Sequence, residues 1–460
     1  MLGEIAFSVS MVWCDIMIHV KGRADEVWCF NKRRDQIMKK VENLIIGAGL
    51  SGISCAYYLG DDYLILEKEH TPGGYCRTIP NDRYVWDYAG HFYHFRTEKY
   101  KKLFTDLVDE NQIIRQKKNT KIFYKDKLVD YPFQTNIHQL EKKEFIECLY
   151  DLYFRNTEED FDNFLDMLYT KFGKAITEKF LKPYNEKLYA VDLHKLDKDA
   201  MGRFFPYADF RQVMESMGNK AKATYNDEFM YLKKGTGYFI DRLFERINKD
   251  KVRLDTGVKS INRKEKFVVT DKGEKIFYEN LINSTPFNQF LAMLEEDEQG
   301  KRAKALSYNK VLVLNLGFDK PSPKFKTEHW VYFPDKNLNF YRIGFYNNIL
   351  MQDNLSVYVE IGFPRDVDKI DVEDELRKAL EGMKEAGIID DSVKLIDKNI
   401  LLMDPAYVHI SEEEKIANYM KEFEKDNIYM LGRYGRWTYN CMEDCVQLAN
   451  DLADRLKKHE

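Results

Sequence analysis

A glycine-rich turn between a short apolar run and a helical segment most constrains the fold of this chain. Val41–Ile46 is rich in β-forming residues, and Gly47-Ala48-Gly49-Leu50-Ser51-Gly52 follows it directly. A helical stretch then runs to Leu59, and a second apolar run, Tyr63–Leu66, ends at Glu67. This order of strand, glycine turn, helix and strand predicts a nucleotide-binding βαβ unit and therefore a Rossmann-like α/β domain.

The three glycines of this turn and the acidic residue after the second strand can each fill a physical role in nucleotide binding. Gly47 permits the tight turn, Gly49 lets the backbone approach a pyrophosphate, and Gly52 lets the helix pack close to the strand. Glu67 lies about 20 residues further on, where it can accept hydrogen bonds from ribose hydroxyls. The alternative is that the glycines serve only the turn.

Two further segments favour FAD over NAD alone. Gly73-Gly74 follows Glu67 closely, with Arg77 three residues beyond the pair. Near the C-terminus, Gly432-Arg433-Tyr434-Gly435 lies between a predicted strand and an amphipathic helix that begins at about Met442. The positive end of that helix could stabilise a reduced flavin, although an ordinary capped surface helix would have the same pattern.

Composition excludes several classes of protein. The 460 residues are 44% hydrophobic and 32% charged, as in a globular chain of about three lobes. With 71 basic and 76 acidic residues the net charge is −5, which argues against a nucleic-acid partner. The seven cysteines include no CxxC pair, so a disulfide framework is not expected and a reducing cytoplasmic location fits. The sequence contains no uninterrupted apolar run of about 20 residues, so no membrane span is predicted.

The pattern of helices and strands predicts a discontinuous organisation. We expect residues 1–37 to be a dispensable N-terminal extension. The predicted FAD-binding domain takes 38–95, 235–300 and 426–460, a helical domain takes 138–234, and a sheet-containing substrate domain takes 96–137 and 301–425. Helices are expected within 138–190, 372–385, 411–423 and from 442, and strands within 121–134, 251–269, 311–316, 330–333, 339–344, 356–362 and 428–431.

Five segments carry a resemblance to a known family. They are Asp87-Tyr88-Ala89-Gly90-His91-Phe92-Tyr93-His94, Tyr131-Pro132-Phe133-Gln134, Pro183-Tyr184-Asn185-Glu186-Lys187, Trp330-Val331-Tyr332-Phe333-Pro334 and Phe340-Tyr341-Arg342. From about Asn43 to Cys445 the chain resembles the flavin-dependent UDP-galactopyranose mutases, within the wider amine-oxidase-like FAD superfamily. The resemblance implies an α/β fold with a Rossmann-like FAD domain, an inserted helical domain and a mixed or antiparallel sheet domain that binds substrate.

The resemblance also implies a reaction and a set of residues. UDP-galactopyranose and UDP-galactofuranose would be interconverted with the N5 atom of reduced FAD as nucleophile, for cell-surface polysaccharide synthesis. NADPH or NADH could reduce the flavin, and a homo-oligomer is compatible with the family. The implied catalytic residues are Arg203, Arg342, His91, Tyr407 and Tyr439. The implied substrate-binding residues are Tyr131, Phe133, Gln134, Phe180, Tyr184, Tyr189, Asn226, Trp330 and Tyr332. The cofactor-binding residues are Gly47, Gly49, Leu50, Ser51, Gly52, Glu67, Lys68, Gly73, Gly74, Arg77, His91, Val258, Gly432, Arg433 and Asp444.

Physical chemistry supports part of this assignment. Two arginines from separate segments, Arg203 and Arg342, can neutralise a diphosphate through charge-assisted hydrogen bonds. His91 and His94 are three residues apart, a spacing that is not convincing for a metal site on its own, so no metal site is predicted.

Some residues depart from the mutase pattern and keep alternatives open. Tyr189 stands where the mutases usually carry Trp, and the second glycine pair continues as Tyr75-Cys76-Arg77-Thr78, closer to amine oxidases. One alternative is therefore an FAD-dependent oxidoreductase of the amine oxidase or protoporphyrinogen oxidase type. Another is a flavin- or nucleotide-sugar-binding protein without catalytic activity.

Overall fold

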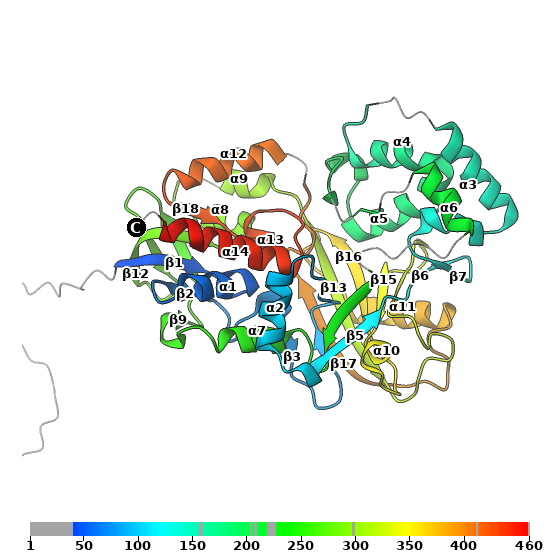
Figure 1. Cartoon of the computed structure of the whole chain (residues 1–460), viewed down its shortest axis with the longest axis horizontal. Coiled ribbons are helices and arrows are strands. Elements are labelled where there is room, and N and C mark those ends of the chain that lie inside the picture. The colour runs from blue at the N-terminus through cyan, green and yellow to red at the C-terminus, as the bar shows by residue number, and fades with distance from the viewer. Residues whose placement is uncertain are drawn as a thin grey trace, which may run out of the picture. The chain divides into compact units, whose positions relative to one another are not determined.

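The computed structural model describes residues 40–155, 160–202, 205–206, 209–218, 227–296, 300–410 and 413–458 (Figure 1). They belong to one compact unit, Lys39–Glu460. The predicted dispensable extension, residues 1–37, lies outside the described residues, and so do Arg203 and Asn226.

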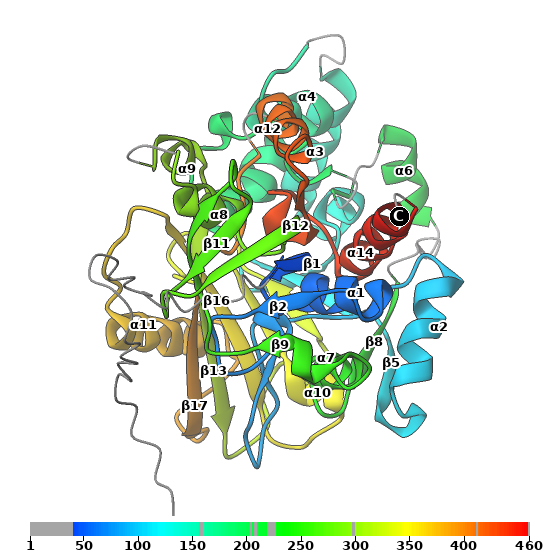
Figure 2. The same cartoon turned by 90° about the vertical axis from the view of Figure 1, so that its left-hand side faces the viewer.

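The predicted glycine turn lies at the carboxyl end of a central parallel strand. β1 (Lys40–Ile46) pairs in parallel with β2 (Leu64–Leu66) on one side and with β12 (Lys275–Asn283) on the other. β9 (Val252–Arg253) continues the sheet beyond β2, and Figure 2 shows β9, β2 and β1 side by side. The Rossmann-like α/β domain predicted from the turn is confirmed, with α1 (Leu50–Leu59) directly after β1.

The same sheet gathers distant parts of the chain around β12. β18 (Ile428–Met430) pairs in parallel with the end of β12, and the antiparallel strands β10 (Val258–Asn262) and β11 (Phe267–Thr270) lie at its start. α14 (Met442–Lys457) packs on α1 through apolar residues that include Val446, Ala449 and Ala453. This packing brings the C-terminal glycine segment to the glycine turn.

A second seven-stranded sheet has an apolar face and a polar, aromatic face. Its order is β17 (Leu395–Met403), β13 (Asn309–Phe318), β16 (Ser356–Pro364), β15 (Arg342–Phe345), β14 (Trp330–Tyr332), β6 (Thr120–Tyr124) and β7 (Lys127–Asp130). Leu312, Leu314 and Leu316 pack in one core with α11 (Val372–Glu385). The alternate residues of the strands, such as Val313 and Tyr358, join a different core. Side chains of successive residues point to opposite faces of a strand, which explains the division.

The predicted helices over 138–190 are confirmed. α3 (Lys142–Phe154), α4 (Phe164–Ile176) and α5 (Lys182–Tyr189), with α6 (Phe210–Gly218), form the helical part of Figure 1. The side chain of Asn163 caps α4 by accepting a hydrogen bond of 3.0 Å from the backbone N–H of Asp166. Residues 177–181 form a π-helical turn that leads into α5.

The remaining elements connect these parts. They are α2 (Glu98–Leu107), α7 (Gly237–Phe244), α8 (Phe287–Met293), α9 (Lys301–Ala305), α10 (Tyr346–Leu350), α12 (Glu413–Glu424), α13 (Gly432–Gly435), β3 (Thr78–Ile79), β4 (Trp86–Asp87), β5 (Ile113–Lys117) and β8 (Glu228–Leu232). Across the described ranges, we find no helix with the length and apolar character that a bilayer crossing requires.

Candidate functional site

One cavity of about 960 Å³ is lined by both sheets and by the helical part of the chain. This volume lies at the upper end of the range, about 300–1,000 Å³, typical of ligand sites. The predicted residues that line it are Gly47, Gly49, Leu50, Ser51, Glu67, Lys68, Gly73, Gly74, Arg77, His91, Tyr131, Tyr184, Tyr189, Val258, Trp330, Tyr332, Arg342, Tyr407, Arg433 and Tyr439. Most of the residues predicted to bind cofactor and substrate therefore share one cavity.

Three glycines of the turn have distinct surroundings. Gly47 has a φ of +96°, which favours glycine, and a Cβ on Gly52 would lie 2.1 Å from the carbonyl oxygen of Gly47. A Cβ on Gly49 would meet nothing within 4 Å. Gly47 and Gly52 are thus required by the fold itself, whereas Gly49 lines the open space of the cavity.

The carboxylate of Glu67 is fixed beside this turn. It accepts hydrogen bonds from the backbone N–H groups of Ala48, at 2.6 Å, and Glu69, at 2.9 Å. The second glycine segment lies against the first, because the N–H of Gly73 donates to the carbonyl oxygen of Ala48 at 2.7 Å. No acidic residue occupies the first turn of α1, so the positive end of that helix meets the cavity with the carboxylate of Glu67 beside it.

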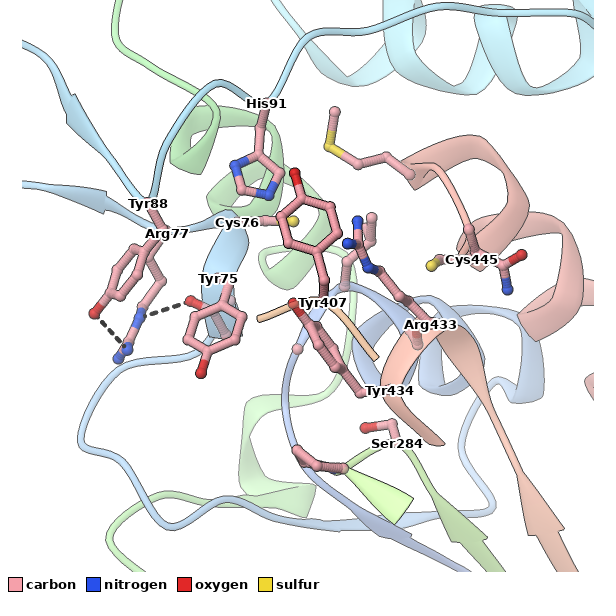
Figure 3. A pocket seen from close by; sticks show the side chains of 18 of the residues that line it. Tyr75, Cys76, Arg77, Tyr88, His91, Ser284, Tyr407, Arg433, Tyr434 and Cys445 are labelled. Carbon is pink, nitrogen blue, oxygen red and sulfur yellow. Dashed lines mark hydrogen bonds between the residues drawn. The ribbon is translucent and has the colours of Figure 1, made fainter. Parts of the chain in front are cut away.

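Arg77 is held next to this wall by three hydrogen bonds. Its guanidinium donates to the carbonyl oxygen of Gly74, to the hydroxyl of Thr71 and to the hydroxyl of Tyr88, at 2.9, 2.9 and 3.0 Å. Figure 3 shows Arg77 beside Tyr88 at the edge of the cavity.

Arg433 brings a charge to the cavity from the C-terminal segment. Its guanidinium carbon lies 4.4 Å from the ring centroid of Tyr439 and 5.3 Å from that of Tyr407, which Figure 3 shows beside it. The Nε atom is buried without a hydrogen-bond partner, and no carboxylate of the described residues forms an ion pair with Arg433. A buried cation in this state is suited to an anionic ligand.

These groups fit a dinucleotide cofactor. The open space at Gly49 allows close approach of a pyrophosphate, the α1 N-terminus and Arg433 offer positive charge, and the oxygens of Glu67 can accept further hydrogen bonds. Val258 and Lys68 complete the wall on the side of Glu67.

The loop that carries His91 is anchored by a fully buried carboxylate, Asp87. Asp87 accepts hydrogen bonds from the hydroxyls of Thr78, at 2.5 Å, and Tyr231, at 2.7 Å, and from the N–H of Thr236, at 3.1 Å. The Thr236 hydroxyl in turn donates to the carbonyl oxygen of His91 at 2.9 Å. The backbone of His91 is therefore held in place from behind the cavity.

The imidazole of His91 is neutral at physiological pH. Burial, assisted by the positive charge of Arg433, lowers the pKa of His91 to about 4. Its Nδ1 atom is buried without a hydrogen-bond partner. The ring can thus accept or donate one hydrogen bond to a ligand without carrying charge.

Arg342 is paired with a buried carboxylate. Arg342 and Glu360 are neighbours across β15 and β16, and the guanidinium forms a bidentate ion pair in which Nη2 and Oε1 are 2.7 Å apart. The side chain of Glu360 is 3% exposed. Glu360 orients the guanidinium and engages two of its N–H groups, which leaves three for other partners.

An aromatic wall surrounds Arg342. The ring of Tyr332 lies 5.1 Å from the rings of both Tyr131 and Tyr184, and the indole N–H of Trp330 donates to the Tyr332 hydroxyl at 3.1 Å. The rings of Tyr407 and Tyr439 stack at 6.0 Å. Burial raises the pKa of the Tyr332 and Tyr184 hydroxyls, so both remain protonated donors at neutral pH.

Six predicted residues among those described do not line the cavity. Phe133 and Phe180 stack at 5.1 Å, and Phe180 stacks on Tyr184 at 5.3 Å, so the pair supports Tyr184 from behind. Gln134 donates to the carbonyl oxygen of Pro206. Asp444 accepts from the backbone N–H of Cys441 at 2.9 Å and pairs with Arg96.

Gly432 and Gly52, the other two predicted residues that do not line the cavity, permit close packing of the backbone. A Cβ on Gly432, whose φ is +75°, would lie 2.0 Å from the hydroxyl of Ser51, so this glycine sets the approach of α13 to α1. Gly52 likewise allows the start of α1 to lie close to the backbone of Gly47. Their assignments as direct ligands stay predictions.

Sequence reasoning missed several lining residues. Ser284 and Thr285 directly follow β12, the parallel strand next to β1. Ligands of such sheets bind at the carboxyl ends of the strands, so the end of this strand could have predicted both residues. No such signal was available for Tyr358 and Lys118, which line the cavity, or for Glu360, which pairs with the lining residue Arg342. Only the pairing of distant strands brings them to the site.

The comparisons with known proteins agree with this architecture. A family profile described as an NAD(P)-binding Rossmann-like domain matches residues 45–110. Coproporphyrinogen III oxidase of Staphylococcus aureus is 24% identical over 318 residues, which cover 60% of this chain and 67% of that protein.

Two solved structures share the fold over nearly the whole chain. Reduced UDP-galactopyranose mutase is 22% identical with a TM-score of 0.84, over 91% of this chain and 94% of that one. A putative protoporphyrinogen oxidase from Exiguobacterium sp. 255-15 is 18% identical with a TM-score of 0.71, over 92% and 99%. The chain therefore contains a Rossmann-like domain, within a fold that it shares with both of these structures.

Proposed function

We propose that this protein is an FAD-dependent enzyme, and more specifically an isomerase that interconverts UDP-galactopyranose and UDP-galactofuranose. One observation carries the finer proposal. Arg342, oriented by Glu360 and surrounded by tyrosine hydroxyls, shares a cavity with the glycine turn and Arg433. An oxidase acting on an uncharged amine has no need of such a guanidinium.

The residues that would hold FAD are those of the glycine turn, Glu67, Arg77 and Arg433. When bound in its reduced form, FAD would supply the nucleophilic nitrogen that ring contraction requires.

The other wall of the cavity would bind the nucleotide. Arg342 would stabilise the negative charge that grows on UDP as the anomeric bond breaks, and would keep UDP close for the return step. The hydroxyls of Tyr332 and Tyr184 would donate hydrogen bonds to phosphate oxygens without adding charge. The neutral ring of His91 would share one hydrogen bond with the sugar or the cofactor.

Product analysis tests the proposal directly. The protein is loaded with FAD, incubated with UDP-galactofuranose in the oxidised and in the dithionite-reduced state, and the sugar nucleotides are separated. We expect UDP-galactopyranose from the reduced protein only. Equal conversion in both states would refute the role of reduced FAD, and UDP binding without conversion would point to a binding protein that lacks catalysis.

A second candidate function is a porphyrinogen oxidase, because the chain is similar to a protein named coproporphyrinogen III oxidase. In that case the cations of the cavity would bind the carboxylates of a porphyrinogen, and the cofactor would accept electrons. Anaerobic bleaching of the flavin by coproporphyrinogen III, with no nucleotide sugar present, would favour this oxidase over the isomerase.

A further inference from the structure

Several cations line the cavity. Arg342 pairs with Glu360, and Arg96 pairs with Glu443 and Asp444. Arg77, Arg433 and Lys118 form no ion pair with a carboxylate of the described residues, although the charge of Asp227 acts on Lys118. Arg77 and Arg433 lie on the wall suited to the cofactor, so Lys118 is the cation of the opposite wall that no ion pair engages.

Lys118 is held in a defined position between β5 and β6. Its own backbone N–H donates to the carbonyl oxygen of Asp227 at 2.7 Å. The next residue is fixed as well, because the N–H of Asn119 donates to Nδ1 of His329 at 3.1 Å. The Nζ atom then lies 5.5 Å from the ring centroid of Tyr131. The backbone around Lys118 is thus fixed beside the cavity, and its ammonium group lies near the ring of Tyr131.

The environment of Lys118 disfavours an isolated charge. The side chain is half-buried, and burial lowers its pKa, with partial opposition from the carboxylate of Asp227. A ligand that brings a negative charge to this point would relieve the desolvation cost and gain a charge-assisted hydrogen bond.

Lys118 and Arg342 lie along one continuous wall. The ring of Tyr131, beside Lys118, is 5.1 Å from the ring of Tyr332, and Tyr332 is the direct cross-strand neighbour of Arg342. Glu360 engages the guanidinium of Arg342, so Lys118 is a second cation of this wall, without an ion pair of this kind.

We propose that Lys118 binds an anionic oxygen group of the substrate, a phosphate or a carboxylate, beside the ring of Tyr131. If the protein is the proposed isomerase, on which this assignment of the anion rests, the group is the diphosphate of the UDP-sugar. Under the oxidase alternative it is a carboxylate of the porphyrinogen. In both cases Lys118 contributes to substrate binding separately from Arg342.

Ligand binding to the FAD-loaded full chain tests the proposal, with UDP, uridine and coproporphyrin III as probes in titration calorimetry. We expect Lys118→Met to weaken the binding of UDP about 10- to 100-fold, the range of a hydrogen bond to a charged group. Uridine, which has no phosphate, should bind both forms equally. Lys118→Arg should retain most of the affinity, and Lys117→Met, which changes the exposed neighbouring lysine, should leave it unaltered.

The outcomes separate this proposal from the proposed function. If Lys118→Met binds UDP as tightly as the unaltered protein, the role of Lys118 is refuted, while UDP recognition stands. If no form binds UDP, the isomerase function fails, and coproporphyrin III decides the role of Lys118. A matching loss of affinity for that tetracarboxylate supports the role, and unchanged or absent binding overturns it.

Discussion

Arg342 and Glu360 face each other on adjacent strands, and the pair combines two functions that mutations can separate. The carboxylate is almost fully buried, and its ion pair with the guanidinium offsets part of the cost of that burial. The guanidinium in turn lies on the cavity wall, where it is available to a ligand. Under the proposed function, stability and catalysis would therefore depend on different partners of the same arginine.

Removing Arg342 alone should impair both properties. We expect Arg342→Gln to destabilise the protein by about 3–5 kcal/mol, because Glu360 is left buried without its partner. Turnover should fall by about 10²- to 10³-fold, as for the loss of one charge-stabilising donor, while FAD stays bound. Urea unfolding and steady-state turnover of UDP-galactofuranose measure the two effects.

The double variant Arg342→Gln/Glu360→Gln is the control. It removes the unpaired charge, so most of the stability should return while turnover stays low. Recovery of turnover along with stability would mean that Arg342 serves only the fold.

At the scale of the element, the N-terminus of α1 has one glycine that the fold does not require. A Cβ at Gly49 would enter the open cavity, and the φ of Gly49, −73°, is accessible to any residue. A Cβ at Gly52 would collide with the backbone of Gly47. The two positions therefore distinguish loss of cofactor binding from loss of fold.

We expect Gly49→Ala to retain the stability of the cofactor-free protein within about 1 kcal/mol and to lose FAD affinity by at least an order of magnitude, because the methyl group blocks the approach of the pyrophosphate. Gly52→Ala should unfold at a clearly lower temperature even without FAD. Thermal unfolding of stripped protein and flavin fluorescence titration measure these effects. Normal FAD affinity in Gly49→Ala would place the pyrophosphate elsewhere.

Elements defined by local pattern were predicted well from the sequence. The glycine turn specifies β1 and α1 by itself, and α11 has the predicted bounds, Val372–Glu385, because an acidic first turn and an apolar stripe mark it. β17 was missed, since Asp397, Lys398 and Asn399 interrupt its apolar pattern at the edge of the sheet. At the site, the individual lining residues of the motifs were predicted, whereas Glu360 and the support of Tyr184 by Phe133 depend on contacts between distant segments.

At the scale of the whole molecule, the buried His329 and His409 and the half-buried His91 link stability to pH. Burial lowers the pKa of His91, His329 and His409 to about 4 each. His409 is typical, because its two ring nitrogens contact the hydroxyl of Ser307 and the carbonyl oxygen of Tyr189, as a neutral ring does. The ordinary pKa near 6.5 applies after unfolding, so the unfolded chain binds more protons between pH 6.5 and 4.

The free energy of unfolding should therefore fall as the pH drops from about 6.5 towards 4. Each histidine contributes up to about 1.4 kcal/mol per pH unit in this window. Urea unfolding at a series of pH values measures the slope. We expect His409→Gln to reduce the slope by about 1.4 kcal/mol per pH unit, the contribution of one histidine. An identical slope in both proteins would contradict the assignment.

The shared cavity has a kinetic consequence. Two ligands that occupy adjoining parts of one chamber each obstruct the other's exit, so exchange of either one slows while the other is present. A dinucleotide seated on the glycine turn should dissociate more slowly in saturating nucleotide, and washing with buffer alone should strip it faster. Under the proposed function, occupancy on one side of the chamber would thereby slow the loss of the cofactor on the other.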